Sequence, residues 1–470
     1  MEILHVTAEC YPIAKVGGLG DVAGALPKYQ QQHGHTVKLI MPMYKTKFVN
    51  ENEWEIDYTG NTNLGEYFFD YTILKEKSGK LGFTLYLVEI QGLLDRAKVY
   101  GYDDDPQRFI AFQICVANWL RQWHHQPDAV HCHDHHAALL PFMFKHCYDY
   151  NMLKDIPTIL TIHNAEYQGW LGWDKSVWLP RYDTWKTGLL EWKGVINPLA
   201  SGIKNAWAVT TVSPSYMEEL RYHSNGLEDL FEYEKGKCTG ILNGIDTQLW
   251  DPQTDTFLEH NYNEASIVKG KQQNKVFLCN AFGLNEDKPL FIFIGRLVGE
   301  KAADVLPDAI RTVLWATEEE ANFLVLGNGD TSVEHRLTEI KYAYPKSYNF
   351  YKGYNEQLSH ELYAGADFLL MPSRVEPCGL NQMYALRYGT MPLVRRTGGL
   401  KDTVTDIGDN GCGICFNHAN IEDILHACNR AIALFQQKKT MQQLRKKMMQ
   451  LDNSWDNTVE KYIQLYQRFI

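Results

Sequence analysis

Apolar runs of strand length alternate with amphipathic segments of helix length along most of the chain. This alternation is typical of parallel strands that are joined by helices packed on the faces of their sheet. Helical patterns in the first half occupy 21–34, 107–123 and 137–150. Strands are predicted there at seven runs: 1–9, 36–42, 83–90, 128–133, 157–165, 206–213 and 238–244.

The pattern weakens after residue 245, where 246–266 is polar, punctuated by aromatic residues and without a period. A second alternating series then begins, with strands predicted at 289–296, 322–329, 348–354, 367–373 and 391–398. We therefore predict an α/β protein with two doubly wound, Rossmann-like domains facing a central cleft, the expected ligand site. The expected boundaries are 1–245 and 246–448, with 449–470 as a C-terminal helix packing back on the first domain.

The composition of the chain argues against some classes of binding partner and indicates a cellular compartment. The net charge of −11 is spread over mixed signs without a basic run, which argues against nucleic acid. No apolar stretch reaches about 18 residues and no signal-peptide pattern opens the chain, so no membrane association is expected. The ten cysteines are irregularly scattered, as buried thiols are in a reducing compartment. These features predict a cytoplasmic protein, and the CxxC at 412–415 is interpreted as a Gly-rich turn.

Unusual local chemistry collects in loops that follow predicted strands. Gly17, Gly18 and Gly20 form a strand-to-helix turn whose amides could approach an anionic or hydroxyl-rich ligand. Arg296 and Lys301 lie five positions apart, which suits a diphosphate but also an ordinary surface pair. These patterns alone leave structural and functional interpretations open.

The stretch HCHDHH at 131–136 holds six possible metal ligands or proton carriers. Alternation along a strand sends His131 and His133 to one face and Cys132 to the other, so they should not converge on one ion. No distant ligand is apparent, and no metal site is predicted. A zinc hydrolase is the alternative, and it would bind stoichiometric metal and lose activity in chelator.

Seven stretches, taken in order, resemble the glycogen and starch synthases, which are retaining glucosyltransferases of the GT-B fold (glycosyltransferase family 5). They are KVGGLGDV, HCHDHH, TIHNAEYQG, NGID, GRLVGEK, MPSRVEPCGLNQ and RYGTMPLVRRTGGLKDTV, and they span nearly the whole chain. The resemblance implies transfer of glucose from ADP-glucose to the non-reducing end of an α-1,4-glucan, glycogen or a maltooligosaccharide. It implies no metal and no cofactor. It also implies no protein nucleophile, because in this family's usual mechanism the donor phosphate takes the acceptor proton.

The resemblance also assigns residues. Arg296 and Lys301 would bind the donor diphosphate, and Glu376 would hold the glucose hydroxyls. His163 would lie beside the glucose ring, and Asp134 would face the acceptor. The remaining expected contacts are Lys15, Gly17, Gly18 and Asp21 in the glycine loop, Tyr100, Asn164 and Asn243 in the cleft, Tyr354 on the nucleobase, and Cys378, Gly379 and Leu380 around the phosphate.

Three positions depart from the family pattern. His135 stands where many relatives have tryptophan, Ala302 replaces a glycine, and Val375 replaces a common aromatic residue. UDP-glucose is the alternative donor, and another GT-B glycosyltransferase, a sugar-nucleotide epimerase and a non-catalytic glucan-binding protein are the alternative functions. Closure of the two domains around the donor is also expected.

Overall fold

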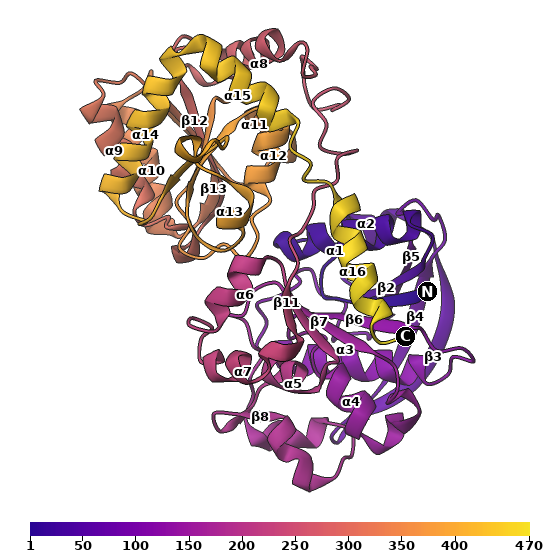
Figure 1. Ribbon diagram of the computed structural model, residues 1–470. Coiled ribbons are helices and arrows are strands. Elements are labelled where there is room, and N and C mark those ends of the chain that lie inside the picture. Colours follow the sequence, from indigo (N-terminus) through magenta and orange to yellow (C-terminus); the bar gives the residue numbers. More distant parts are fainter. The chain divides into compact units, whose positions relative to one another are not determined.

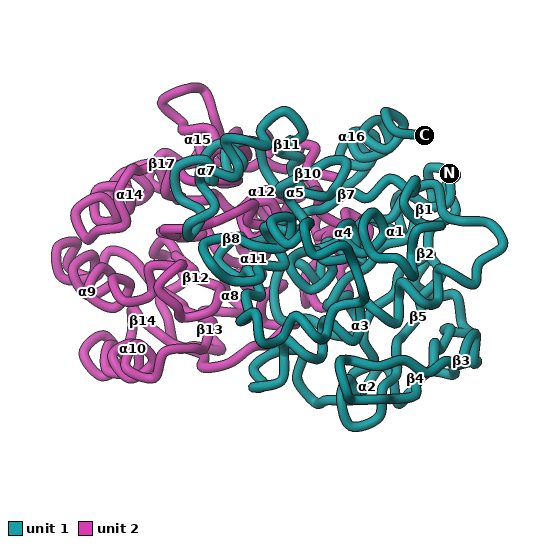
Figure 2. Tube along the Cα trace, turned by 90° about the horizontal axis from the view of Figure 1, so that it is seen from below, with its two compact units in different colours: residues 1–243, 455–470 teal, residues 244–454 magenta.

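The computed structural model describes all residues, 1–470, and divides into two compact units, which are coloured separately in Figure 2. Unit 1 comprises residues 1–243 and 455–470, and unit 2 comprises residues 244–454. Figure 1 labels the elements. None of the helices is long and apolar enough to cross a membrane.

Unit 1 is built on a nine-stranded sheet of order β11-β10-β7-β6-β1-β2-β5-β4-β3. All neighbours are parallel except the pairs β3–β4 and β4–β5. The seven strands predicted in this half are present, whereas the antiparallel ribbon β3–β4 was missed. The strands are β1 (Glu2–Val6), β2 (Thr36–Pro42), β3 (Trp54–Leu64), β4 (Tyr67–Glu76), β5 (Thr84–Glu89), β6 (Ala129–His133), β7 (Thr158–Ile162), β10 (Ala208–Thr211) and β11 (Cys238–Gly240).

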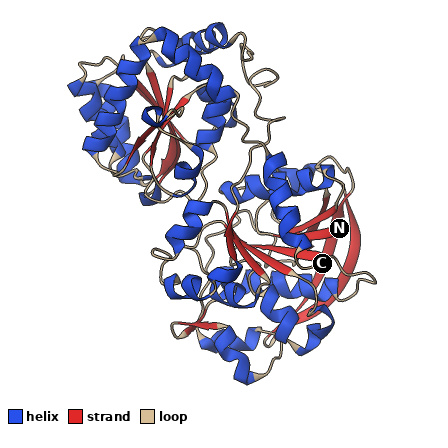
Figure 3. Cartoon of the chain, viewed as in Figure 1, coloured by secondary structure: helices blue, strands red, loops and turns tan.

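Helices cover the sheet of unit 1, as Figure 3 shows. The α-helices are α1 (Gly18–Gln32), α2 (Lys47–Glu51), α3 (Asp105–Leu120), α4 (Leu140–His146), α5 (Pro198–Asn205), α6 (Pro214–Leu220), α7 (Glu228–Tyr233) and α16 (Trp455–Gln467). Short 3-10 helices lie at η1 (Tyr148–Leu153), η2 (Trp173–Trp178), η3 (Thr184–Leu189) and η4 (Lys235–Lys237), and β8 (Glu191–Trp192) pairs with β9 (Val195–Ile196).

The last helix, α16, is part of the core of unit 1. Its buried face carries Trp455, Val459, Tyr462 and Tyr466, which join one apolar cluster with side chains of α1, β1, β6 and β7. Each of these four side chains is at most 2% exposed. Burial on this scale is worth about 2 kcal/mol per large apolar side chain, so α16 is a structural element rather than a tail.

Unit 2 is built on an all-parallel sheet of order β14-β13-β12-β15-β16-β17. Its strands are β12 (Leu290–Leu297), β13 (Asn322–Gly329), β14 (Tyr348–Lys352), β15 (Phe368–Met371), β16 (Met391–Arg395) and β17 (Ile414–Phe416). The helices are α8 (Ile267–Phe282), α9 (Leu306–Ala316), α10 (Thr331–Ala343), α11 (Glu356–Gly365), α12 (Asn381–Arg387), α13 (Gly398–Thr403), α14 (Ile421–Gln436) and α15 (Lys438–Met449), with 3-10 helices η5 (Gly299–Lys301) and η6 (Ile407–Asp409).

The segment without a period, 246–266, belongs to unit 2 and is fastened by aromatic stacking. The Trp250 ring lies 3.8 Å from the ring of His360 and 3.8 Å from that of Tyr384, with near-parallel planes. Asp255 accepts hydrogen bonds from His360 Nδ1 at 2.7 Å and from the Tyr388 hydroxyl at 2.5 Å. The segment therefore packs on α11 and α12 although its sequence has no helical or strand period.

Candidate functional site

The glycine loop of unit 1 lies between β1 and α1. Gly17 is the N-cap of α1, and a Cβ added at Gly17 or Gly18 would meet no atom within 4 Å, so space is open beside the loop. Lys15 Nζ lies 2.7 Å from Asp21 Oδ1. The structure thus brings these four predicted residues together at the carboxyl end of β1.

A residue that the sequence interpretation missed, Glu9, holds this loop in place. Its carboxylate accepts hydrogen bonds from the backbone amides of Val16 at 2.6 Å and Gly17 at 3.0 Å, and from the Tyr100 hydroxyl at 2.7 Å. Burial raises the pKa of Glu9 above its ordinary value. Tyr100, a predicted cleft residue, therefore acts on the loop through Glu9, and it also stacks on His136.

Asp134 and His163 meet where β6 and β7 end. Asp134 has a left-handed backbone, with φ 55°, and its Oδ1 accepts the backbone N–H of His163 at 2.7 Å. Burial raises the pKa of Asp134 to about 7 and lowers the pKa of His163 to about 3, so the imidazole is neutral at physiological pH. The adjacent Asn164 accepts the amide of Glu166 through Oδ1 at 3.0 Å. Asn243, the last residue before unit 2, is buried and its Oδ1 has no hydrogen-bond partner.

In unit 2, the structure brings Lys301 and Glu376 together. Lys301 Nζ lies 2.6 Å from both carboxylate oxygens of Glu376, and the Ser373 hydroxyl donates to Oε2 at 2.8 Å. Glu376 is only 6% exposed, so its charge is held by these two donors. Arg296 is 3.5 Å from Glu300 and nearly half exposed, which leaves its guanidinium accessible.

Glycines shape the loop that follows Glu376. Gly379 has φ 72°, a conformation that L side chains rarely adopt, and Leu380 is the N-cap of α12. Gly399 lies against the backbone of Cys378, since an added Cβ would be 2.0 Å from its carbonyl oxygen. Tyr354 lies outside this cluster, after β14, and is 66% exposed.

The three departures from the family pattern have different structural settings. The ring of His135 packs over Gly169, where an added Cβ would lie 2.4 Å from Cδ2. Burial lowers the pKa of His135 to about 4. Ala302 is fully buried with φ 55°, so an alanine holds a backbone conformation that glycine adopts at lower cost. The structure does not explain the exchange at Val375, whose amide donates to the carbonyl of Glu300.

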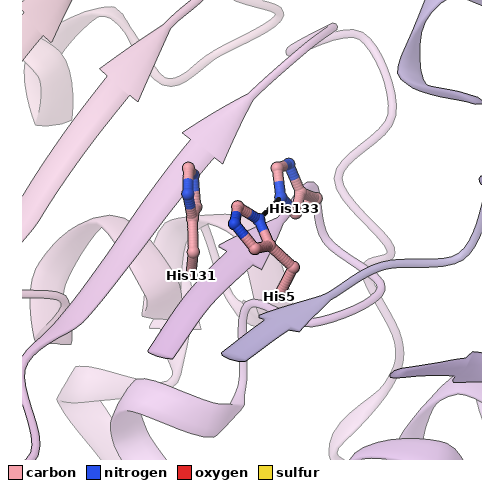
Figure 4. Close-up of side chains that lie close together, drawn as sticks. All are labelled: His5, His131 and His133. Atoms are coloured by element: carbon pink, nitrogen blue, oxygen red, sulfur yellow. Dashed lines mark hydrogen bonds between the residues drawn. The ribbon is translucent and has the colours of Figure 1, made fainter. Parts of the chain in front are cut away.

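A buried histidine cluster lies inside unit 1 and reaches the site loop, because His133 Nδ1 is 3.0 Å from His163 Nε2. The possible ligand atoms of His5, His131 and His133 lie within 4.8 Å of one another, and Figure 4 shows the three rings side by side on adjacent strands. The predicted face of His131 and His133 is correct. His5 was not predicted to join them, because it is brought there by the strand register, in which it is the partner of His131. The ring nitrogens are already hydrogen-bonded to protein atoms.

All ten cysteines, including Cys412 and Cys415, are free thiols.

Comparison with known proteins shows the family to which this chain belongs. Residues 2–233 match the starch synthase catalytic domain, and residues 277–448 match glycosyl transferases group 1. A glycogen synthase of Flavobacterium johnsoniae is 51% identical over 470 residues, covering 100% of this chain and 99% of the relative. A glycogen synthase of Streptococcus pneumoniae is 37% identical, covering 100% of both chains.

Solved structures of similar fold support the same family. The catalytic domain of starch synthase IV from Arabidopsis thaliana, bound to ADP and acarbose, superposes with a TM-score of 0.90 at 31% identity, covering 99% of each chain. A sucrose-phosphate synthase from Thermosynechococcus elongatus, at 15% identity and a TM-score of 0.64 with 99% and 98% coverage, shows the fold alone.

The two sheets and the cationic and acidic loops at their carboxyl ends define a GT-B glycosyltransferase. The chain belongs to the family of glycogen and starch synthases, and its activity is glucosyl transfer onto glucan. The fold, family and reaction class implied by the sequence motifs are confirmed.

Proposed function

We propose that this chain elongates glycogen or maltooligosaccharides at their non-reducing ends, with ADP-glucose as donor and with retention of anomeric configuration. The observation that carries the proposal is the Lys301–Glu376 pair. Its ammonium group donates to both oxygens of a buried carboxylate, in the loops expected to bind the donor. ADP in the starch synthase IV structure supports the choice of base.

The chemistry would rest on positioning and electrostatics. Arg296 and Lys301 would neutralise charge on the departing nucleoside diphosphate, while Glu376 would bind glucose hydroxyls. The neutral imidazole of His163 and the buried Asp134 would bound the glucose and acceptor. The remaining proposed substrate contacts are Lys15, Gly17, Gly18, Asp21, Tyr100, Asn164 and Asn243 on unit 1, and Tyr354, Cys378, Gly379 and Leu380 on unit 2.

The donor phosphate would accept the proton of the acceptor hydroxyl, so no protein base is needed. Arg296 and Lys301 would neutralise the leaving diphosphate, so the reaction would need no metal or cofactor. We place the protein in the cytoplasm, because ten free thiols suit a reducing compartment. Activity in excess chelator should equal activity without it. Loss of activity that added zinc restores would instead support a metal-dependent reaction.

The donor is tested by steady-state kinetics with ADP-glucose and UDP-glucose, each with a glycogen primer. We expect a higher kcat/KM with ADP-glucose and an α-anomeric product by NMR. A preference for UDP-glucose would reverse the donor assignment, and no elongation with either donor would refute the proposed function.

The role of Glu376 is tested by Glu376→Gln, which keeps the shape of the side chain but removes its charge. We expect kcat to fall at least ~100-fold, the usual effect of losing one electrostatic group of an active site. Asp304→Asn is the matched control, because Asp304 forms an exposed ion pair with Arg374, two residues before Glu376. Equal losses in the two variants would show that the loop is merely sensitive to substitution.

A further inference from the structure

A continuous chain of hydrogen bonds connects His163 to the C-terminal helix of unit 1. His163 Nε2 lies 3.0 Å from His133 Nδ1, and His133 Nε2 lies 3.0 Å from His5 Nδ1. His5 Nε2 lies 2.7 Å from Gln30 Oε1, and Gln30 Nε2 donates to the Tyr466 hydroxyl at 3.0 Å. The chain thus passes from β7 through β6 and β1 to α1 and α16.

The sheet register explains why these side chains meet. Residue 5 of β1 is the register partner of residue 131 of β6, and His133 lies two positions further along the same face. His5, Gln30, His131 and His133 are fully buried. Polar groups so deeply buried need partners, and here each ring nitrogen finds one within the protein.

Each imidazole in this chain of hydrogen bonds is neutral and carries one N–H proton. Burial lowers the pKa of His5 to about 4 and that of His163 to about 3, and it lowers the pKa of His131 and His133 well below the ordinary value. A neutral imidazole has one N–H and one lone pair, so the role of one nitrogen fixes the role of the other.

The proton positions follow from Gln30. Its Oε1 only accepts, so the proton of His5 is on Nε2 and Nδ1 is an acceptor. His133 must therefore donate through Nε2, which leaves its Nδ1 as an acceptor. His163 in turn must donate through Nε2, so its Nδ1 carries the lone pair and can accept a hydrogen bond from a sugar hydroxyl.

The Tyr466 hydroxyl lies between the Gln30 amide and His131, and a hydroxyl can accept one hydrogen bond while it donates another. Because it accepts from Gln30 Nε2, it donates to His131 Nδ1, 2.7 Å away. His131 then donates through Nε2 to the Thr161 hydroxyl at 2.5 Å, which is 2.6 Å from that of Thr210. Rotating the amide of Gln30 by half a turn would reverse every donor and acceptor, and would move the proton of His163 to Nδ1.

We propose that Gln30 and Tyr466 are positioning residues that fix the tautomer of His163 through His5 and His133, so that His163 presents an acceptor nitrogen to the substrate. The proposal rests on the proposed placement of His163 beside the transferred glucose. It assigns a chemical role to the C-terminal helix, which supplies Tyr466.

The direct test is NMR of the full-length chain labelled with ¹⁵N at histidine, since two-bond ¹H–¹⁵N correlations distinguish the two neutral tautomers. His163→Gln identifies the signals of His163. We expect the Nε2–H form in the wild type and a mixture of tautomers in Tyr466→Phe and in Gln30→Leu. A wild-type Nδ1–H form, or a pattern unchanged in both variants, would overturn the proposal.

Kinetics provide the second test. In Tyr466→Phe and Gln30→Leu, kcat should fall roughly 3- to 10-fold, as expected when one oriented hydrogen bond to the substrate is weakened. Tyr150→Phe is the matched control, because Tyr150 is also a buried tyrosine of unit 1 and donates to the amide oxygen of Asn118 at 3.0 Å. Its kcat should be unchanged.

A double-mutant cycle separates positioning from general destabilisation. In a His163→Ala background, Tyr466→Phe should lower kcat no further, and an undiminished effect there would contradict the relay. The proposed function fails on a different observation, the absence of glucan elongation by the wild type. The tautomer of His163 would still be measurable in that event, so the two failures are distinguishable.

Discussion

Asp134 combines two unusual properties at the scale of a single residue. Its backbone is left-handed, and burial raises its pKa to about 7 from the ordinary 3.8. Aspartate and asparagine tolerate this backbone better than most residues, whereas alanine loses ~1–2 kcal/mol in it. The residue type at this position is therefore constrained by conformation as well as by chemistry.

The raised pKa predicts a pH dependence of stability. The folded protein binds the Asp134 proton more tightly than the unfolded chain does, so this contribution is full below about pH 4 and is lost as the pH rises through about 7. Asp134→Asn should remove this pH dependence. At about pH 8 its free energy of unfolding should exceed that of the wild type by up to about a few kcal/mol. Urea unfolding at several pH values measures this.

Asp134→Ala is the control for conformation, because it also removes the charge but strains the backbone. It should be less stable than Asp134→Asn at every pH. Wild-type and Asp134→Asn stabilities that run parallel from pH 4 to 8 would show that Asp134 is not protonated in this range.

The histidine chain shows where prediction from the sequence ends at this scale. The alternation of His131 and His133 in one strand is visible in the sequence and was predicted correctly. His5, Gln30 and Tyr466 were missed, because they reach the same point through strand register and helix packing across separations of up to 436 residues. No local pattern encodes such a meeting.

At the scale of elements, apolar runs predicted the parallel strands well because those strands are buried on both faces. The antiparallel ribbon β3–β4 was not predicted, because its first strand is largely polar and exposed and therefore contains no apolar run. Lys301 and Glu376 were each assigned to the donor site through a family resemblance, but their contact with each other was not predicted. That contact depends on how the loops after β12 and β15 fold, which their separate sequences do not show.

The glycines at the start of α13 support the loop that carries Glu376. An added Cβ at Gly399 would lie 2.0 Å from the carbonyl oxygen of Cys378. We expect Gly399→Ala to lose ~1–3 kcal/mol of stability, as overpacked sites do, and to lower kcat because the loop must shift. Thermal unfolding and kinetics on the same sample measure both effects.

Gly299→Ala is the control for thermal stability, since a Cβ there would meet no atom within 4 Å. Its unfolding temperature should lie close to that of the wild type. An unfolding temperature for Gly399→Ala that also equals the wild-type value would contradict the close packing of α13 on the Glu376 loop.

At the scale of the whole molecule, unit 2 is an insertion between the two segments of unit 1. Its ends are fastened together, because the amide of Ile245 donates to the carbonyl of Asn453 at 2.8 Å. Unit 2 also has its own core, which runs from Phe291 to Met448. A fragment of residues 244–454 should therefore fold alone with a single cooperative transition.

The proposed donor residues Arg296, Lys301 and Glu376 all lie in this fragment. Calorimetry should show that the fragment binds ADP and that Lys301→Met weakens this binding. Neither the fragment nor its Lys301→Met variant should transfer glucose, because both lack unit 1. A folded fragment without affinity for any nucleoside diphosphate would move the donor site away from unit 2.

The position of α16 at the far end of the chain also constrains the order of assembly during synthesis. A ribosome releases residues 1–243 first, then all of unit 2, and only then the helix that completes the apolar cluster of unit 1. Unit 2 can fold while the chain is still growing, whereas unit 1 must wait with an uncovered hydrophobic face. The first segment to emerge is thus the last to mature, and a prematurely terminated chain has neither a finished core nor Tyr466 to orient the histidines.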